Sequence, residues 1–353
     1  MELEPYVGGK SSLPGMKRVI KLASNESALG PSPRAVAAYT AMAERMYRYP
    51  DGSAGELRQA LARHHGLDAK AIVCGNGSDE ILTMLAKAYA GPGDEVLYSQ
   101  YGFVMYPVAA LAAGARPVTA PETHYRTDVD ALLSRVGPKT KIVFLANPNN
   151  PTGSYLTDEE VRRLHAKLPE NVLLVIDAAY AEFVKRNDYE PGVQLVSTAA
   201  NVVMTRTFSK IYAMGGLRLG WAYCPPAIAD VLNRVRPPFN VNSAAQAAAV
   251  AALEDVAFAD QARIHNDTWR DWLTDRLRDD GFVVSPSVGN FVLVHFDREG
   301  RHTAAAANRS LNERGIIVRA LEPYGLLDAL RITIGREDEM QAVATALGAF
   351  RAR

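Results

Sequence analysis

Continuous apolar runs alternate with segments of helical spacing through the first two thirds of the chain. The runs are short, and they lie at 71–75, 141–146, 171–176 and 201–205. Such runs are typical of strands that are buried on both faces of a parallel sheet. Helical segments between them complete a repeated strand–helix–strand pattern. The pattern predicts an α/β fold whose larger domain is doubly wound around a mostly parallel sheet.

Local signals place two of the helices. Thr157 and Glu160 have the spacing of a capping box, which predicts a helix that starts beside them, between two apolar runs. The segment GNGSDE at 75–80 opens a second helix, which we expect to extend to about Tyr89. The first 30 or so residues are rich in proline, glycine and serine, so we expect an irregular arm there.

The pattern changes near residue 240. An alanine-rich helical region at 243–279 is followed by a strand at 290–296, a helix at 303–314, strands at 316–321 and 330–335, and a closing helix from about 337. This order predicts a smaller α+β domain. The expected organisation is an N-terminal arm at 1–32, a large domain at 33–245 and a small C-terminal domain at 246–353. The boundary between the two domains falls inside the long helical region.

Composition narrows the class of protein. Of the 353 residues, 48% are hydrophobic and 22% are charged, which fits a folded globular chain. The 39 lysines and arginines balance the 39 aspartates and glutamates, so no net electrostatic field favours binding to a nucleic acid or an anionic membrane. The two cysteines, Cys74 and Cys224, are too few for a disulfide scaffold or a zinc site. Because the sequence has neither a signal-peptide pattern nor a membrane-length apolar run, we expect a cytoplasmic enzyme without a metal.

One lysine has chemically informative neighbours. Hydroxyl groups at Thr207 and Ser209 precede Lys210, and a Gly-Gly turn and Arg218 follow it. An amine at this point can form a Schiff base with an aldehyde cofactor, while hydroxyls and a guanidinium bind the cofactor's phosphate. Taken alone, the segment is more often a solvated loop, so the interpretation depends on the rest of the chain.

Two further segments directly follow apolar runs, where ligands bind in open α/β sheets. NPNNPTG at 147–153 is a tight turn, from which the Asn150 amide can face a cofactor oxygen. Asp177 ends the apolar segment VLLVID, where a carboxylate needs a positive partner such as a protonated pyridine nitrogen. Tyr180 follows three residues later and can donate to a ring oxygen. An ordinary turn and a helix N-cap are the alternatives for these segments.

The turn at 75–80 supplies an anion site at a helix N-terminus through Gly77, Ser78 and Asp79. It is not GxGxxG, which disfavours a nicotinamide-dependent dehydrogenase. In this order, GNGSDE, NNPTG, DAAY and TFSK-x7-R resemble the fold-type I pyridoxal-phosphate aminotransferases. The resemblance extends from LASNES at 22–27 through RYPDG at 48–52 to LRITIG at 330–335. Within that family it is nearest to the histidinol-phosphate aminotransferase subfamily.

The resemblance implies that pyridoxal 5'-phosphate is the cofactor and that Lys210, Asp177 and Tyr180 are catalytic. Lys210 then holds the cofactor as a Schiff base and moves a proton, and Asp177 keeps the pyridine nitrogen protonated. Asn150 and Tyr180 hydrogen-bond the phenolic oxygen of the ring. The residues implied around the cofactor phosphate are Gly77, Ser78, Asp79, Thr207, Ser209 and Arg218.

Aromatic residues complete the implied cofactor site. Phe103, in YGFVMY, matches the aromatic residue that stacks on the pyridine ring, although Tyr101 and Tyr106 remain alternatives. Tyr49 resembles the tyrosine that reaches the cofactor phosphate of the neighbouring subunit. The resemblance therefore implies a homodimer with shared active sites.

Basic and arm residues make up the implied substrate site. Arg331 matches the arginine that binds the substrate α-carboxylate, and a guanidinium fork suits that group. Arg319 matches the subfamily arginine near the distal phosphate of histidinol phosphate. Tyr6 and Asn25, in the arm, are expected to close over the substrate.

The implied reaction is transamination between L-histidinol phosphate and 2-oxoglutarate, which gives imidazole acetol phosphate and L-glutamate in histidine biosynthesis. An aromatic amino-acid aminotransferase is the main alternative, because it shares every cofactor residue named above. A decarboxylase for phosphate-bearing amino acids has the same fold and stays open. A catalytically silent binder of the cofactor, or the effector domain of a regulator, is disfavoured because every core catalytic position is filled.

Overall fold

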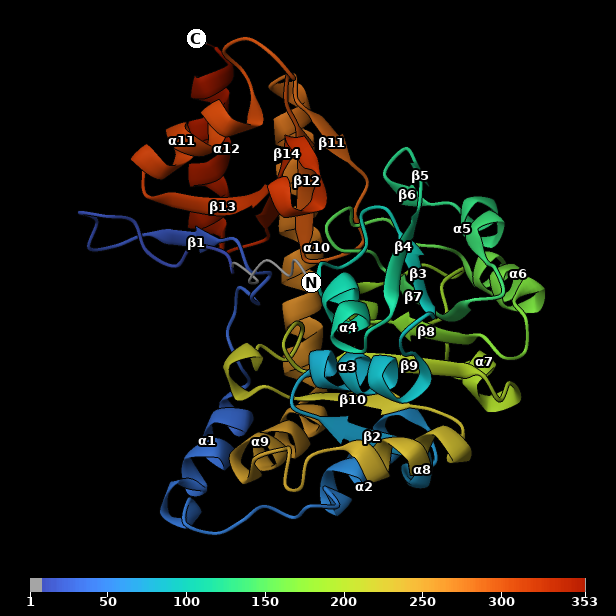
Figure 1. Ribbon diagram of the computed structural model, residues 1–353. Coiled ribbons are helices and arrows are strands. Elements are labelled where there is room, and N and C mark those ends of the chain that lie inside the picture. Colours follow the sequence, from blue (N-terminus) through green and yellow to red (C-terminus); the bar gives the residue numbers. More distant parts are fainter. Residues whose placement is uncertain (1–7, 353) are drawn as a thin grey trace.

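The computed structural model of the chain describes residues 8–352 and has two lobes (Figure 1). The larger lobe contains a seven-stranded sheet with the order β2-β10-β9-β8-β7-β3-β4. Its strands are β2 (Ile72–Gly75), β3 (Glu95–Ser99), β4 (Arg116–Ala120), β7 (Thr140–Ala146), β8 (Leu173–Asp177), β9 (Val202–Thr207) and β10 (Gly220–Tyr223). All neighbouring pairs are parallel except those of β10, which is antiparallel to β2 and β9. The predicted α/β fold with a mostly parallel sheet is confirmed.

Helices cover both faces of this sheet because successive strand residues point to opposite sides. One core lies between the sheet and α3 (Ser78–Tyr89), α4 (Met105–Ala112) and α8 (Pro226–Val235). The other core lies between the sheet and α2 (Gly55–His65), α5 (Val129–Arg135), α6 (Asp158–Lys167) and α7 (Val193–Thr198). On β2, for example, Val73 is buried in the first core and Ile72 in the second. The doubly wound arrangement follows directly from strands that are apolar on both faces.

Both predicted helix starts are confirmed. α6 begins behind a capping box, in which the Thr157 hydroxyl accepts from the Glu160 amide and the Glu160 carboxylate accepts from the Thr157 amide at 2.8 Å. α3 begins at Ser78 directly after Gly77, whose φ of 85° is favourable only for glycine, and it ends at Tyr89. The start of α3 is therefore fixed at the edge of the sheet.

The smaller lobe is built on a five-stranded sheet with the order β1-β13-β14-β12-β11. Its strands are β1 (Ile20–Leu22), β11 (Val283–Ser285), β12 (Phe291–His295), β13 (Ile316–Leu321) and β14 (Leu326–Thr333). Helices α11 (Ala304–Glu313) and α12 (Glu337–Arg351) pack against it around a separate core. This is the predicted α+β unit. The expectation of a wholly irregular arm is wrong at 20–22, because β1 pairs in parallel with β13 and so attaches the arm to this sheet.

The predicted helical region at 243–279 consists of two helices, α9 (Ser243–Glu254) and α10 (Val256–Asp279). They meet at Asp255, whose ψ of 59° is not helical and whose carboxylate accepts from the Ser32 hydroxyl. α9 packs against α1 (Pro33–Ala41) and α2, whereas α10 continues to α12 of the smaller lobe (Figure 1). The division of the chain at residue 245 stays a prediction.

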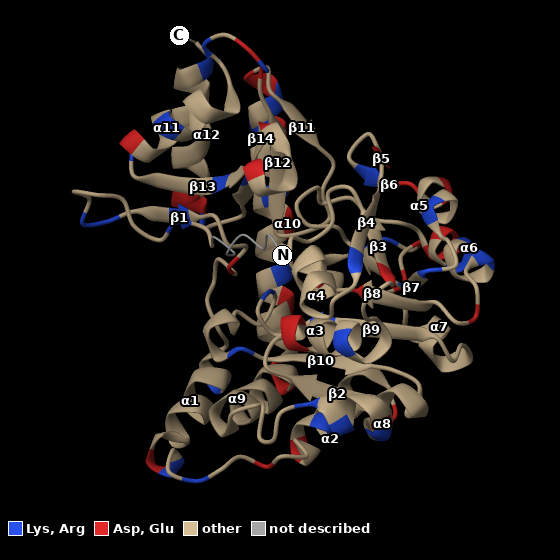
Figure 2. Cartoon of the chain, viewed as in Figure 1, with Lys and Arg blue, Asp and Glu red and all other residues tan. Residues whose placement is uncertain are grey.

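Short elements complete the fold. They are the hairpin β5 (Glu122–Thr123) and β6 (Arg126–Thr127), and the 3₁₀ helices η1 (Ala43–Arg45), η2 (Ala69–Ala71), η3 (Ala181–Phe183), η4 (Gly215–Leu217) and η5 (Glu322–Tyr324). Lys and Arg side chains and Asp and Glu side chains occur together on both lobes (Figure 2). Within residues 8–352, no helix has both the length and the apolar character needed to span a membrane.

Strand register brings several polar side chains together at one edge of the large sheet. β7, β8 and β9 are parallel neighbours, and Asp177 lies beside Ala146 on one side and Thr205 on the other. The turn that starts at Asn147 therefore lies beside Asp177 at the carboxyl ends of the strands. Open α/β sheets bind ligands at such an edge.

Candidate active site

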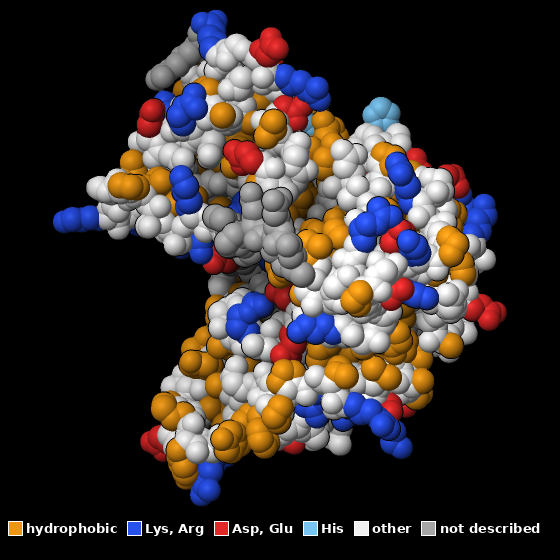
Figure 3. Space-filling view, viewed as in Figure 1, with side chains coloured by type: hydrophobic (Ala, Val, Ile, Leu, Met, Phe, Trp, Pro, Cys, Tyr) orange, Lys and Arg blue, Asp and Glu red, His pale blue; other side chains and the backbone are white. Residues whose placement is uncertain are grey.

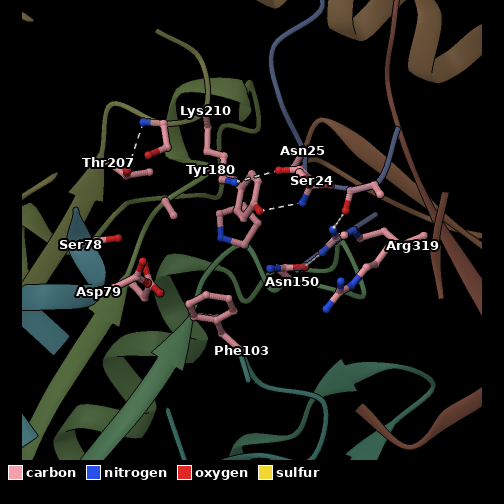
Figure 4. A pocket seen from close by; sticks show the side chains of 18 of the residues that line it. Ser24, Asn25, Ser78, Asp79, Phe103, Asn150, Tyr180, Thr207, Lys210 and Arg319 are labelled. Atoms are coloured by element: carbon pink, nitrogen blue, oxygen red, sulfur yellow. Dashed lines mark hydrogen bonds between the residues drawn. The ribbon is translucent and has the colours of Figure 1, made fainter. Parts of the chain in front are cut away.

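A cavity of about 310 Å³ opens at this edge, where the smaller sheet and the arm face the large sheet. Thirteen of the residues singled out in the sequence line it (Figure 4). These are Asn25, Ser78, Asp79, Phe103, Asn150, Asp177, Tyr180, Thr207, Ser209, Lys210, Arg218, Arg319 and Arg331. They come from segments far apart in the sequence, so the fold itself assembles the cavity.

One end of the cavity has the character of an anion cradle. Ser78 and Asp79 are the first residues of α3, so their amide groups lie at the positive end of a helix of 12 residues. The Arg218 guanidinium donates to the Asp79 carboxylate at 3.2 Å. It lies so close to Gly77 that a Cβ there would collide with it. The φ of 85° at Gly77 also disfavours any residue with a Cβ, so glycine is favoured beside the cavity although it does not line it.

Hydroxyl groups extend this cradle. The Thr207 hydroxyl accepts from the Ser209 amide at 3.1 Å, which turns the chain between β9 and Lys210. Figure 4 shows Ser78, Asp79 and Thr207 at the same end of the cavity. Amide groups at a helix start, hydroxyl groups and a guanidinium are a donor set that suits a phosphate.

Asp177 is buried at the end of β8 and lines the cavity. Its carboxylate accepts from the Tyr106 hydroxyl at 3.0 Å and from the Thr205 hydroxyl at 3.4 Å. Burial nevertheless raises the pKa of Asp177 to about 6, although both hydrogen bonds lower it. A cation held against this carboxyl group would therefore be strongly favoured.

Tyr106 is the partner of Asp177 that sequence reasoning missed. The sequence left it as an alternative to Phe103 for ring stacking, but it is fully buried and stacks on Phe144 with 4.8 Å between ring centroids. Phe103, in contrast, lines the cavity. The pattern YGFVMY contains no signal that separates these roles, because they depend on how α4 packs on the sheet.

Lys210, Tyr180 and the arm meet on another wall. Lys210 Nζ lies 5.6 Å from the centroid of the Tyr180 ring and 3.5 Å from the Ser24 carbonyl oxygen, to which it donates. The Tyr180 hydroxyl accepts from Asn25 Nδ2 at 2.8 Å. Burial raises the pKa of Tyr180 to about 12, so its hydroxyl stays protonated at neutral pH.

Asn25 is held in a left-handed conformation, with φ 55°. Its backbone amide donates to the Thr333 hydroxyl at 3.0 Å, and its backbone carbonyl oxygen accepts from Asn290 Nδ2 at 3.0 Å. Both partners belong to the smaller lobe. The arm thus joins the smaller lobe to Tyr180 of the larger lobe, a link that motif reading did not reveal.

Two arginines form the far side of the cavity. Arg319 on β13 and Arg331 on β14 are neighbours in register, and both are buried. Arg331 donates to Asn150 Oδ1 and, at 2.8 Å, to the Ala23 carbonyl oxygen. Figure 4 shows Arg319 at the end opposite to Ser78 and Asp79. The cavity therefore has basic groups at both ends.

The remaining candidates lie elsewhere. Tyr49 is 82% exposed and stacks on Phe239 with 4.7 Å between centroids, in a separate surface hollow. Within one chain it does not reach the cavity. Tyr6 lies outside the described residues. Tyr324, in the turn after β13, lines the cavity without having been singled out, and an aromatic residue beside the Arg319 strand was the available signal.

Comparison with known proteins decides the family. The model of the family described as aminotransferase class I and II matches residues 17–347. The chain belongs to this family. It is therefore an enzyme of the aminotransferase type, and the family that the motifs implied is confirmed.

Curated relatives and solved structures agree with this membership. A protein named histidinol-phosphate aminotransferase from Paramagnetospirillum magneticum is 58% identical over 350 residues, which cover 99% of this chain and 96% of that protein. Another of that name, from Rhodospirillum centenum, is 59% identical over 348 residues, with 99% and 96% covered. The crystal structure of histidinol-phosphate aminotransferase from Sinorhizobium meliloti in complex with pyridoxal-5'-phosphate has a TM-score of 0.87 and 31% identity, with 96% of this chain and 92% of that one covered.

Proposed function

We propose that this chain transfers the amino group of L-histidinol phosphate to 2-oxoglutarate, with pyridoxal phosphate as cofactor, in histidine biosynthesis in the cytoplasm. The products are imidazole acetol phosphate and L-glutamate. The names of relatives that are 58% and 59% identical support this substrate. The observation that carries the proposal is that one cavity has an anion cradle at one end, Lys210 in its wall and two buried arginines at the other end.

The residues present fit pyridoxal phosphate. The cradle of the α3 N-terminus, Ser209 and Arg218 would hold its phosphate, and Asp177 is a buried carboxyl group that gains from a protonated ring nitrogen. Phe103 would lie against the ring. When bound, the cofactor supplies an aldehyde for the substrate amine and a ring that accepts electrons from the substrate Cα.

The chain's own groups then have distinct tasks. Lys210 Nζ would be the amine that holds the aldehyde, and as a free amine it would be the base for the proton of the substrate Cα. Asn150 Oδ1 accepts from Arg331, which leaves the Asn150 amide nitrogen as the donor to a ring oxygen. The Tyr180 hydroxyl accepts from Asn25, so its own proton would be available to donate to a ring oxygen. Both donors would orient the ring of a bound cofactor.

Arg319 is assigned to the distal phosphate of the substrate. Arg319→Ala is expected to lower kcat/KM for histidinol phosphate by about tenfold to a few hundredfold, because a phosphate accepts one or more charge-assisted hydrogen bonds. Phenylalanine has no distal anion, so its half-reaction should change little. Stopped-flow measurement of the half-reactions with histidinol phosphate, glutamate and phenylalanine tests this assignment.

Arg314→Ala is the matched control, because Arg314 is an exposed arginine that bonds Ser310 at the end of α11. It should leave all three half-reactions unchanged. Equal losses for histidinol phosphate and phenylalanine in Arg319→Ala would make Arg319 a structural residue. A wild-type preference for phenylalanine would assign the chain to the aromatic amino-acid aminotransferases instead.

The proposed active unit is a homodimer in which Tyr49 serves the neighbouring cavity. Tyr49 belongs to an apolar surface around α1 and η1, visible at the lower left of Figure 3. Its exposed apolar side chains are Val36, Tyr39, Met46, Tyr47, Tyr49 and Phe239. Four of them, Tyr39, Met46, Tyr49 and Phe239, line a hollow of about 750 Å³. A contiguous apolar surface of this kind is typical of a protein–protein interface, and a second copy would cover it.

Mixed subunits test the shared site. Tyr49→Phe and Lys210→Ala homodimers are each expected to be severely impaired. A hybrid dimer carries one complete site, so random reassortment should restore up to about a quarter of wild-type activity. Activity is measured after partial unfolding and refolding of the mixture, with differently tagged subunits to prove that hybrids have formed. Hybrids without activity would remove the shared-site proposal.

A further inference from the structure

The β5–β6 hairpin lies against the turn that carries Asn150. Its two connecting residues, His124 and Tyr125, both have positive φ, at 52° and 59°. The Tyr125 carbonyl oxygen accepts from the Ser154 hydroxyl at 3.0 Å, and Arg126 Nε donates to the Tyr155 carbonyl oxygen at 3.0 Å. These two hydrogen bonds attach the hairpin, which projects beside β4 in Figure 1, to the residues that follow the turn.

Glu122, the first residue of this hairpin, connects the hairpin through Tyr101 to Asn149, near the start of the turn. Glu122 Oε1 accepts from the Tyr101 amide at 3.2 Å. The Tyr101 carbonyl oxygen accepts from Asn149 Nδ2, also at 3.2 Å. The two peptide groups on either side of Tyr101 are therefore held by Glu122 and by Asn149.

Both held segments lead into the cavity. Two residues after Tyr101 is Phe103, and directly after Asn149 is Asn150; both line the cavity wall. The hydrogen bonds that Glu122 and Asn149 make to Tyr101 thus link two cavity side chains. One is Phe103, which would lie on the cofactor ring, and the other is Asn150, which would bond a ring oxygen. A displacement of about 1 Å in such groups can cost a large part of the rate.

The surroundings of Glu122 disfavour a purely structural role. Burial raises the pKa of this carboxyl group to about 7, although Ser99 and the Tyr101 amide oppose the shift. The titratable groups near it include the Tyr101 and Tyr125 phenols, stacked at 5.9 Å, with Asp328 and Arg298 beyond them. Arg126, on the paired strand β6, forms its ion pair with Glu160 instead. Within residues 8–352 this largely buried carboxyl group forms no ion pair with a lysine or arginine, which costs stability, and such groups gather at functional sites.

We propose that Glu122 is a positioning residue, whose carboxyl oxygen fixes the Tyr101 segment and so places Phe103 against Asn150 for cofactor binding. The inference rests on the proposed cofactor but not on the identity of the amino donor. What the position needs is a hydrogen-bond acceptor at Oε1, which glutamine also supplies and alanine does not.

Three variants and one control test this role. Glu122→Ala is expected to change the visible circular dichroism of bound pyridoxal phosphate, to weaken cofactor binding by about fivefold or more, and to lower kcat by about tenfold while KM changes less. Glu122→Gln should stay within about threefold of wild type in all of these. Glu122→Asp, which withdraws the acceptor by one methylene, should lie between them and replaces the alanine variant if that one does not fold.

Glu95→Ala is the matched control. Glu95 is a buried carboxylate on β3 of the large sheet, and it pairs with Arg116 at the amino end of that strand, away from the cavity. It should lower the melting temperature without changing the circular dichroism of the cofactor. Wild-type spectra in Glu122→Ala or Glu122→Asp, equal damage in Glu122→Gln, or the same spectral change in Glu95→Ala would overturn the inference.

The spectral and binding measurements need no amino donor. If histidinol phosphate proves not to be the substrate, the proposed function fails while the Glu122 inference is still decided by cofactor spectra. If Glu122 proves irrelevant, the half-reactions of the wild-type enzyme still decide the proposed function.

Discussion

Lys210→Ala is expected to abolish turnover. Lys210 is the only lysine among the described residues that line the cavity, and its Nζ lies beside the Tyr180 ring and the Ser24 carbonyl oxygen. No other amine in this set can attach to the cofactor aldehyde or take the proton from the substrate Cα. The anion cradle remains intact in the variant, so pyridoxal phosphate should still bind, with weaker affinity.

Borohydride reduction of the wild-type holoenzyme followed by peptide mapping measures the attachment directly. The label should appear on the peptide that contains Lys210 and should be missing in Lys210→Ala. Lys185→Ala is the control, because Lys185 is an exposed lysine that pairs with Asp267 at 3.4 Å. A label on another lysine, or turnover in Lys210→Ala at more than about a thousandth of the wild-type rate, would contradict the assignment.

The sequence predicted the fold best where strands are buried on both faces. β2, β7, β8 and β9 are almost fully buried, so their continuous apolar runs are visible without any structure. β4 is different: it is an edge strand, four of its five residues are intermediate or exposed, and its sequence RPVTA carries no strong period. β1 and the β5–β6 hairpin have two or three residues each, and only their tertiary partners define them.

The site residues divide in the same way, into those that a local sequence pattern reveals and those that only tertiary contacts define. Asn150, Asp177 and Lys210 follow strands that meet at one edge, so their convergence could be predicted from parallel topology alone. The bond from Asn25 to Tyr180, in contrast, joins residues 155 positions apart through the arm. The bond from Tyr106 to Asp177 depends on how α4 packs. Such contacts are set by tertiary packing, and no local pattern encodes them.

Asp177→Asn is expected to lower kcat by about a thousandfold or more, which corresponds to about 4 kcal/mol in the activation barrier. A neutral amide cannot keep a ring nitrogen protonated, so the cofactor would accept electrons poorly from the substrate Cα. Cofactor binding should survive in part, because the cradle is unchanged. Stopped-flow half-reactions give the rate, with Asp188→Asn, at an exposed carboxylate bonded to Tyr155, as control. A variant within about tenfold of wild type, or about 1.4 kcal/mol, would contradict this role.

Although Asp177→Asn should lower kcat, it should raise the stability of the cofactor-free protein. Burial raises the pKa of Asp177 to about 6, above its ordinary value of 3.8, so the folded state disfavours ionisation. The penalty is absent below pH 3.8, grows as the pH rises, and is complete above about pH 6. Asparagine does not ionise, so at pH 8 Asp177→Asn should stabilise the cofactor-free protein by on the order of 3 kcal/mol.

Thermal unfolding at pH 8 and near pH 4, with and without pyridoxal phosphate, separates these effects. Without cofactor, the variant should melt higher than wild type at pH 8 and at nearly the same temperature near pH 4. With cofactor at pH 8 the order should reverse or the gap should close, because a ring cation removes the penalty on the wild-type carboxylate alone. If the cofactor stabilises both proteins equally at pH 8, Asp177 does not face a cation, and the assignment of the ring nitrogen to this carboxylate is wrong.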